Sequence, residues 1–168
     1  AIEERRPQFR RAVVEMRPRR RYPAGDVTAH ITGYVGEISE GQLADTTFAG
    51  YDAGRVVGKT GLERAYEERL GGDPGVRYME VTALGSVVRQ FGPQEGVEPT
   101  PGEDLRLALD LSLQAFADTV FPDHREGAVL AMDPRTGGVL TLYSHPAFDP
   151  NAFVGGVEQE VWERLRDD

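Results

Sequence analysis

Residues 127–143 read GAVLAMDPRTGGVLTLY, which is two apolar runs separated by a polar turn. The runs occupy 128–132 and 139–143, and the turn contains Asp133, Pro134 and Gly137. Proline early and glycine late in such a loop are typical of an antiparallel hairpin. The second run is apolar at nearly every position, so we expect both of its faces to be covered. The segment therefore predicts a β-hairpin that is part of a larger fold.

A helix is expected directly before this hairpin. Leucines alternate with other residues over 105–109, as in a strand, and Asp110 can then cap a helix that ends before Pro122. One side of that helix carries apolar residues, namely Leu113, Phe116, Ala117 and Val120. After the hairpin, a loop with two prolines leads to a last short helix that contains Val161, Trp162 and Leu165.

The first part of the chain predicts shorter elements and a boundary. They are a strand at 12–16, a helical turn at 27–31, a short helix capped by Ser39 and reaching about Asp45, and a hairpin over 76–82 and 86–91. Residues 92–103 are rich in glycine, proline and glutamate and show no periodicity, so we expect a boundary there. The prediction is an α+β protein with two regions, 1–102 and 103–168.

The most regular helix signal begins at Thr60. Thr60 and Glu63 have the spacing of a capping box, in which the hydroxyl and the carboxylate bond reciprocally to the backbone. The expected apolar face consists of Leu62, Ala65, Tyr66 and Leu70. The adjacent carboxylates of Glu67-Glu68 and of Glu103-Asp104 are expected to be solvated, because sequence neighbours point in different directions.

Composition narrows the range of functions. The chain has 168 residues, a net charge of −9 and no cysteine, which excludes disulfides and thiolate metal sites. Its three histidines, His30, His124 and His145, lack the spacing of a metal site, so we expect no metal. Residues 1–21 carry eight arginines and three glutamates, or +5, which leaves −14 for the remainder. That acidic remainder would repel a polyanion, so a nucleic-acid partner is not expected.

Gly58-Lys59-Thr60 invites comparison with a phosphate-binding loop. Such a loop needs four residues between its first glycine and the Gly-Lys pair, whereas three separate Gly54 from Gly58. Nucleotide binding is therefore only a remote alternative, and no cofactor is expected. The favoured interpretation is the start of a helix at Gly61.

Four blocks of motif residues follow one another along the sequence: Arg21, Tyr22 and Pro23; Gly33, Tyr34 and Gly36; Gly58, Lys59, Thr60, Gly61 and Glu63; Asp133, Pro134 and Gly137. Together they resemble class B penicillin-binding proteins of the penicillin-binding protein 2 type. Residues 104–110 and 146–151 also match blocks of this family, in order and at its spacing. The resemblance covers nearly the whole chain.

The resemblance implies a pedestal, or dimerisation, domain over 1–102 and the incomplete helix-plus-hairpin start of a transpeptidase domain over 103–168. The family's nucleophile is a serine with a lysine three residues later, on which a serine acyl-enzyme forms. The four serines here are instead followed at that spacing by Gln42, Arg89, Ala115 and Ala147, and Lys59 is the only lysine. No catalytic residue is therefore assigned, and the chain is predicted to be a non-catalytic scaffold.

The resemblance also implies partners and a location for the parent protein. The parent would cross-link peptidoglycan stem peptides, react with β-lactams, and contact a scaffold protein and a membrane glycan polymerase of the elongation complex. It would lie at the extracytoplasmic (periplasmic) face of the bacterial cytoplasmic membrane, with an anchor outside this chain, which has no stretch of about 20 apolar residues. Two candidate partner surfaces are the arginine-rich start and the loop-like segment 48–57, in which Tyr51 and Arg55 are predicted to be exposed.

Two other interpretations stay open at this stage. One is a complete enzyme whose active residues have not been identified, and the other is a self-standing extracytoplasmic interaction domain. In the favoured interpretation the hairpin at 127–143 lacks neighbouring strands, so the isolated chain is expected to associate with itself or to be loosely ordered in its last third.

Overall fold

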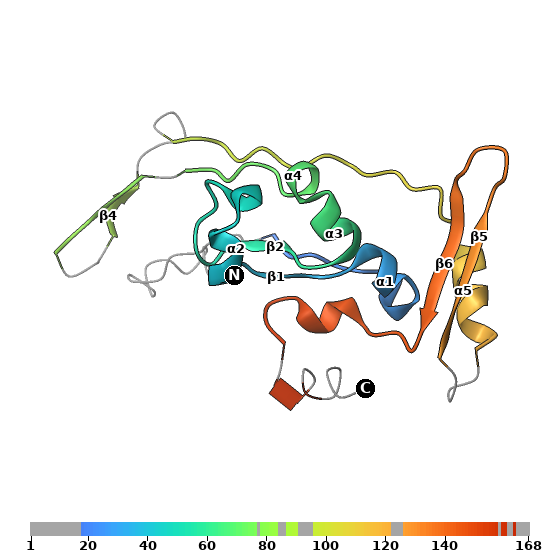
Figure 1. Ribbon diagram of the computed structural model, residues 1–168. Coiled ribbons are helices and arrows are strands. Elements are labelled where there is room, and N and C mark those ends of the chain that lie inside the picture. The colour runs from blue at the N-terminus through green and yellow to red at the C-terminus, as the bar shows by residue number, and fades with distance from the viewer. Residues whose placement is uncertain are drawn as a thin grey trace, which may run out of the picture. The chain divides into compact units, whose positions relative to one another are not determined.

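The computed structural model describes residues 18–76, 78–83, 87–90, 96–121, 126–157, 159, 160 and 163 (Figure 1). Contacts divide the chain into two units. One comprises Ala1–Pro18 and Gly71–Glu103, and the other Arg19–Leu70 and Asp104–Asp168. The boundary expected at 102/103 concerns domains along the sequence and stays a prediction.

The larger unit begins with short helices and strands. They are the 3-10 helix η2 (Gly25–Thr28), α1 (Ala29–Thr32), β1 (Val35–Glu37), α2 (Glu40–Leu43), the 3-10 helix η3 (Thr46–Phe48), β2 (Val56–Gly58), α3 (Gly61–Ala65) and α4 (Glu67–Leu70). β1 and β2 are antiparallel, with Val35 opposite Gly58. Ile38, which follows β1, forms a buried cluster with Phe48 of η3 and Val57 of β2.

Two of the predicted local elements are confirmed here. The helical turn expected at 27–31 corresponds to η2 and α1. Ser39 caps α2 through a complete capping box with Gln42, although α2 ends at Leu43, two residues before the predicted end.

The prediction for the helix at Thr60 is wrong in two respects. The Thr60 side chain makes no capping hydrogen bond, and the helix is interrupted at Tyr66, which separates α3 from α4. The buried positions are Glu63 and Glu67, whereas Tyr66 is 37% exposed. The Glu63 carboxylate, which a capping box would direct to the backbone at Thr60, pairs instead with Arg20, 43 residues away.

The second part of the larger unit contains the hairpin. β5 (Gly127–Met132) and β6 (Val139–His145) pair antiparallel, with Leu130 opposite Leu142, and α5 (Leu111–Thr119) packs on β6. Asp110 caps α5 by accepting from the amides of Ser112 and Leu113, as predicted. β5 and β6 form a two-stranded sheet within the described residues.

Three finer predictions for this part are wrong. Residues 105–109 are not a strand. The buried residues of α5 are Gln114 and Ala117, while Phe116 is 62% exposed. β6 buries Thr141 and Tyr143 on one face but leaves Leu142 on the other face 38% exposed. The hydrogen-bonding demands of Gln114 decide which face of α5 is buried, and an apolar pattern does not reveal them.

Gln114 fastens α5 to its surroundings. Its side chain is fully buried, and its Nε2 donates to the carbonyls of Val27 and Leu142, both at 2.8 Å. Its Oε1 accepts from the Leu142 amide at 3.0 Å and from the Thr141 hydroxyl. One amide side chain thereby joins α5, β6 and η2.

In the smaller unit, β3 (Met79–Val81) and β4 (Val87–Gln90) pair antiparallel, which confirms the predicted hairpin in shorter form. Bridges join Asp73 to Thr100 and Val76 to Val97. The strand expected at 12–16 and the residues Val161, Trp162 and Leu165 lie outside the described residues. In the part of the chain that the structure covers, the helices are too short or too polar to span a bilayer.

Candidate functional site

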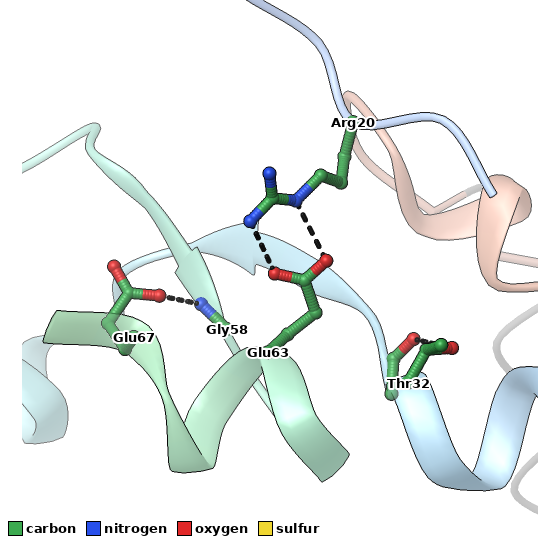
Figure 2. Close-up of polar contacts among 6 residues, drawn as sticks. Arg20, Thr32, Gly58, Glu63 and Glu67 are labelled. Carbon is green, nitrogen blue, oxygen red and sulfur yellow. Dashed lines mark hydrogen bonds and ion pairs between the residues drawn. The ribbon is translucent and has the colours of Figure 1, made fainter. Parts of the chain in front are cut away.

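The central feature of the larger unit is a bidentate ion pair between Arg20 and Glu63. The guanidinium donates from Nε to Oε1 at 2.8 Å and from Nη2 to Oε2 at 2.7 Å (Figure 2). The hydrogen bond to Glu63 raises the pKa of Arg20. Paired donors on a carboxylate are the strong form of this contact, so the pair fixes residue 20 against α3.

Glu67 contributes a second buried carboxylate one turn further on. Its Oε2 accepts from the Gly58 amide at 2.7 Å, which ties α4 to the end of β2 (Figure 2). Residue 58 must be glycine, because a Cβ there would lie 2.2 Å from the backbone carbonyl of Glu63. The expectation that Glu67 is solvated is therefore wrong, since its partner is a backbone donor nine residues earlier. Arg20, Gly58, Glu63 and Glu67 are called the carboxylate cluster below.

The glycines of the second and third motif blocks bring the backbones of these blocks into contact. Gly33 and Gly61 have positive φ values of 71° and 59°. A Cβ on Gly33 would lie 2.0 Å from the Thr60 carbonyl oxygen, and one on Gly36 would touch the Lys59 side chain at 3.2 Å. These blocks, far apart in the sequence, are therefore one packed corner, with Thr60 itself exposed.

Tyr22 is the buried member of its motif block, while Arg21 and Pro23 are exposed. Its hydroxyl has no hydrogen-bond partner among the described residues. Burial, with the Glu63 carboxylate nearby, raises the pKa of Tyr22. Tyr34 stacks its ring on Phe153, with centroids 4.1 Å apart. Both tyrosines thus act through packing.

Lys59 and Ser39 meet at one acceptor. The Lys59 ammonium and the Ser39 hydroxyl both donate to Oε1 of Gln42. Burial and the nearby Arg64 lower the pKa of Lys59. Ser39 is exposed, and its Oγ also accepts from the Gln42 amide at 3.3 Å. The hydroxyl and the amine therefore share an acceptor and are not hydrogen-bonded to each other.

The fourth motif block forms the turn of the β5–β6 hairpin. Asp133 accepts from the Arg135 amide at 2.9 Å, which lowers the pKa of its carboxyl. Gly137 has a φ of 72° and donates to the Asp133 carbonyl at 2.8 Å. Pro134 is exposed in the same turn. These residues shape a loop, and the structure does not bring them to the carboxylate cluster.

Tyr51 and Arg55 stack on each other, with the Arg55 guanidinium 3.7 Å from the Tyr51 ring centroid. Neither is fully exposed, because Tyr51 packs on the Ile38, Phe48 and Val57 cluster. Burial is the main cause that raises the pKa of Tyr51. The expectation of two exposed side chains is wrong, while their role at a partner surface stays a prediction.

The sequence pattern does not single out two residues of this site. Arg20 is one of eight arginines in residues 1–21, and Glu67 is predicted to be solvated. The available signal was the spacing of Glu63 and Glu67, four residues apart, which places both on one helix face. The described residues contain no group of acidic, histidine or cysteine side chains that could hold a metal ion.

Comparison with known proteins places this architecture in a family. Residues 1–107 match the family described as the penicillin-binding protein dimerisation domain. The peptidoglycan D,D-transpeptidase MrdA of Escherichia coli K12 is 40% identical over 167 residues, which cover 96% of this chain and 26% of that protein. This chain therefore spans about a quarter of the length of that relative.

Solved structures agree with the sequence comparison. The complex between penicillin-binding protein PBP2 and MreC from Helicobacter pylori matches with a TM-score of 0.70 and 38% identity, over 89% of this chain and 27% of that one. A peptidoglycan synthase complex that coordinates polymerization and crosslinking matches with a TM-score of 0.69 and 34% identity, over 89% and 28%. The α+β expectation and the resemblance are thereby confirmed, and the chain belongs to the penicillin-binding protein dimerisation-domain family.

Proposed function

We propose that this chain is the pedestal, with the first transpeptidase elements, of a peptidoglycan D,D-transpeptidase of the penicillin-binding protein 2 type. Within that enzyme it supports and positions the catalytic part and carries no catalytic group itself. The observation that carries this proposal is the environment of Lys59, the only lysine of the chain.

Acyl transfer to a serine requires a base that accepts the proton of the hydroxyl. Lys59 is directed to Oε1 of Gln42, and the Ser39 hydroxyl donates to the same oxygen. An amine that acts as the base must accept a hydrogen bond from the hydroxyl, whereas here both groups are donors to a third. This geometry favours a structural role for both residues.

Exposed apolar side chains support the view that the chain is part of a larger protein. They lie on α5, at its C-cap and on the β5–β6 hairpin: Leu111, Phe116, Val120, Leu130 and Met132, each at least 50% exposed. Large exposed apolar groups that gather on one helix and one hairpin are typical of a surface that another part of a protein covers. We propose that the remainder of the transpeptidase domain covers them in the full-length protein. In the isolated chain, the same side chains are the expected sites of self-association.

The partners and the location follow from the relatives. One solved relative is bound to MreC and another belongs to a peptidoglycan synthase complex. We extend this to the present chain and propose contacts with a scaffold protein and with a membrane glycan polymerase at the extracytoplasmic face of the cytoplasmic membrane. The stacked pair of Tyr51 and Arg55 is the proposed contact, because tyrosine and arginine are enriched in interface centres.

Replacing Arg55 by glutamate should weaken binding to the MreC-type protein of the same organism by about fivefold or more, as expected for a residue worth more than about 1 kcal/mol at an interface. Binding is measured by titration calorimetry with the purified chain. Arg135→Glu makes the same charge change on the exposed turn of the β5–β6 hairpin and should leave the affinity unchanged.

Two results would argue against this part of the proposal. If the unsubstituted chain does not bind the MreC-type protein, that protein is ruled out as the scaffold partner of this chain. If Arg55→Glu and Arg135→Glu weaken binding equally, the effect is one of net charge, and Tyr51 and Arg55 are ruled out as the contact surface.

A further inference from the structure

After β6 the chain turns back along its own first described segment. The 3-10 helix η5 (Pro150–Phe153) packs against β1 and η2, and Pro150 and Phe153 are buried (Figure 1). Phe148 meets the His30 ring edge-on at 5.3 Å, and His30 Nε2 lies 3.0 Å from the Pro146 carbonyl oxygen. Two segments more than 100 residues apart in the sequence therefore share one packed interface.

Asn151 supplies the polar contact at the centre of this interface. Its Oδ1 accepts from the Tyr22 amide at 2.9 Å, and its Nδ2 donates to the Tyr22 carbonyl at 3.0 Å. The side chain thus pairs with both backbone groups of one residue, as a neighbouring strand would. Asp149 Oδ1 accepts from Asn151 Nδ2 at 2.8 Å and from its backbone amide at 2.9 Å, which fixes the orientation of the side chain.

Few substitutions can preserve this pairing. The pairing requires a short side chain with one hydrogen-bond donor and one acceptor, and asparagine provides both. Asn151 is the only asparagine in the chain. A second contact supports it three residues later, where Arg19 Nη2 donates to the Val154 carbonyl at 2.8 Å.

We propose that Asn151 is a positioning residue of the transpeptidase reaction. This proposal rests on the function proposed above. By holding residues 146–154 against Tyr22, it fixes the direction in which the full-length chain continues from residue 157 into the catalytic part. Tyr22 lies two residues after Arg20, which is held by Glu63. The contact therefore joins the carboxylate cluster to the segment that leads into the enzyme.

The contact itself is tested in the chain described here by hydrogen exchange. Asn151→Ala removes the acceptor of the Tyr22 amide, so exchange at Tyr22 should become about tenfold faster or more, the loss expected for one hydrogen bond. The Lys59 amide, which donates to the Tyr34 carbonyl at 2.8 Å, should change by less than about twofold. Gln159→Ala is the matched control, because that amide side chain bonds only to Glu163 among the described contacts.

The positioning role is tested in the full-length protein that contains this chain. Asn151→Ala should lower the first-order rate constant of acylation by a fluorescent penicillin about tenfold or more, as misplacement of reacting groups does. The non-covalent affinity for the penicillin should stay within about twofold. A purely structural defect would reduce the fraction of molecules that become labelled and leave this rate constant unchanged, so the labelled fraction is measured in the same experiment.

Three outcomes decide against the proposal. Unchanged exchange at Tyr22 overturns the contact. Faster exchange at Tyr22 with an unchanged acylation rate constant overturns the positioning role. A full-length unsubstituted protein that takes no label overturns the proposed function and the positioning role with it, while exchange at Tyr22 still shows whether the contact exists.

Discussion

Replacing Gln114 by leucine is expected to lower the free energy of unfolding by about 3–5 kcal/mol. Leucine has nearly the same size but leaves the Val27 carbonyl, both backbone groups of Leu142 and the Thr141 hydroxyl without their partner. Each unsatisfied buried polar group costs about 1–3 kcal/mol, and part of this is recovered by burying the leucine. The measurement is urea denaturation followed by circular dichroism.

The matched control is Gln159→Leu, which makes the same substitution at an exposed position. It should change the free energy of unfolding by less than about 0.5 kcal/mol. Gln114→Glu should also be destabilising at neutral pH, because a carboxylate cannot donate to the two carbonyls. A loss below about 1 kcal/mol for Gln114→Leu would contradict the role of Gln114 as the residue that joins α5, β6 and η2.

Replacing Glu63 by glutamine is expected to cost about 2 kcal/mol of stability, the range of hydrogen bonds to charged groups. The Glu63 side chain is only 10% exposed, so its partner cannot be replaced fully by water. The side chain of Arg20 is 39% exposed, and solvent screening therefore keeps the expected loss below that of a fully buried pair. A double-mutant cycle with Arg20→Met should give a coupling free energy of about 1.5–3 kcal/mol.

Glu68→Gln is the control for this cycle, because it makes the same substitution on the neighbouring helix α4, at an exposed position. It should be close to neutral in the same denaturation experiment. A coupling free energy near zero between Arg20 and Glu63 would show that the ion pair contributes nothing to the carboxylate cluster.

Local chemistry explains which elements could be predicted. The β5–β6 hairpin and the cap at Asp110 are determined by residues within a few positions of each other. Ser39 and Thr60 have similar local sequences, each with a side chain three residues later that can complete a capping box. The box forms at Ser39, while at Thr60 the required glutamate is held by Arg20. The two sites differ because Arg20 lies 43 residues from Glu63 in the sequence, and a local sequence pattern cannot indicate a contact at that separation.

Buried polar residues explain most of the remaining errors. Gln114 and Glu67 are polar, so pattern analysis places them in water, yet both are buried with specific partners. Their partners are backbone groups and a hydroxyl. Such groups occur throughout any sequence, so the sequence does not indicate which of them will bind a given side chain. The contact of Asn151 with Tyr22 is of the same kind, because each residue lies in its own sequence block and only the fold brings the two together.

Incubation of the purified chain with a penicillin, followed by intact-mass measurement, tests most directly whether this part of the protein lacks a nucleophile. We predict no covalent adduct, because the Ser39 hydroxyl and the Lys59 amine are bonded to Gln42 and not to each other. An adduct of the mass of the penicillin, present in the unsubstituted chain and absent from Ser39→Ala, would contradict a non-catalytic role and would identify Ser39 as an active serine.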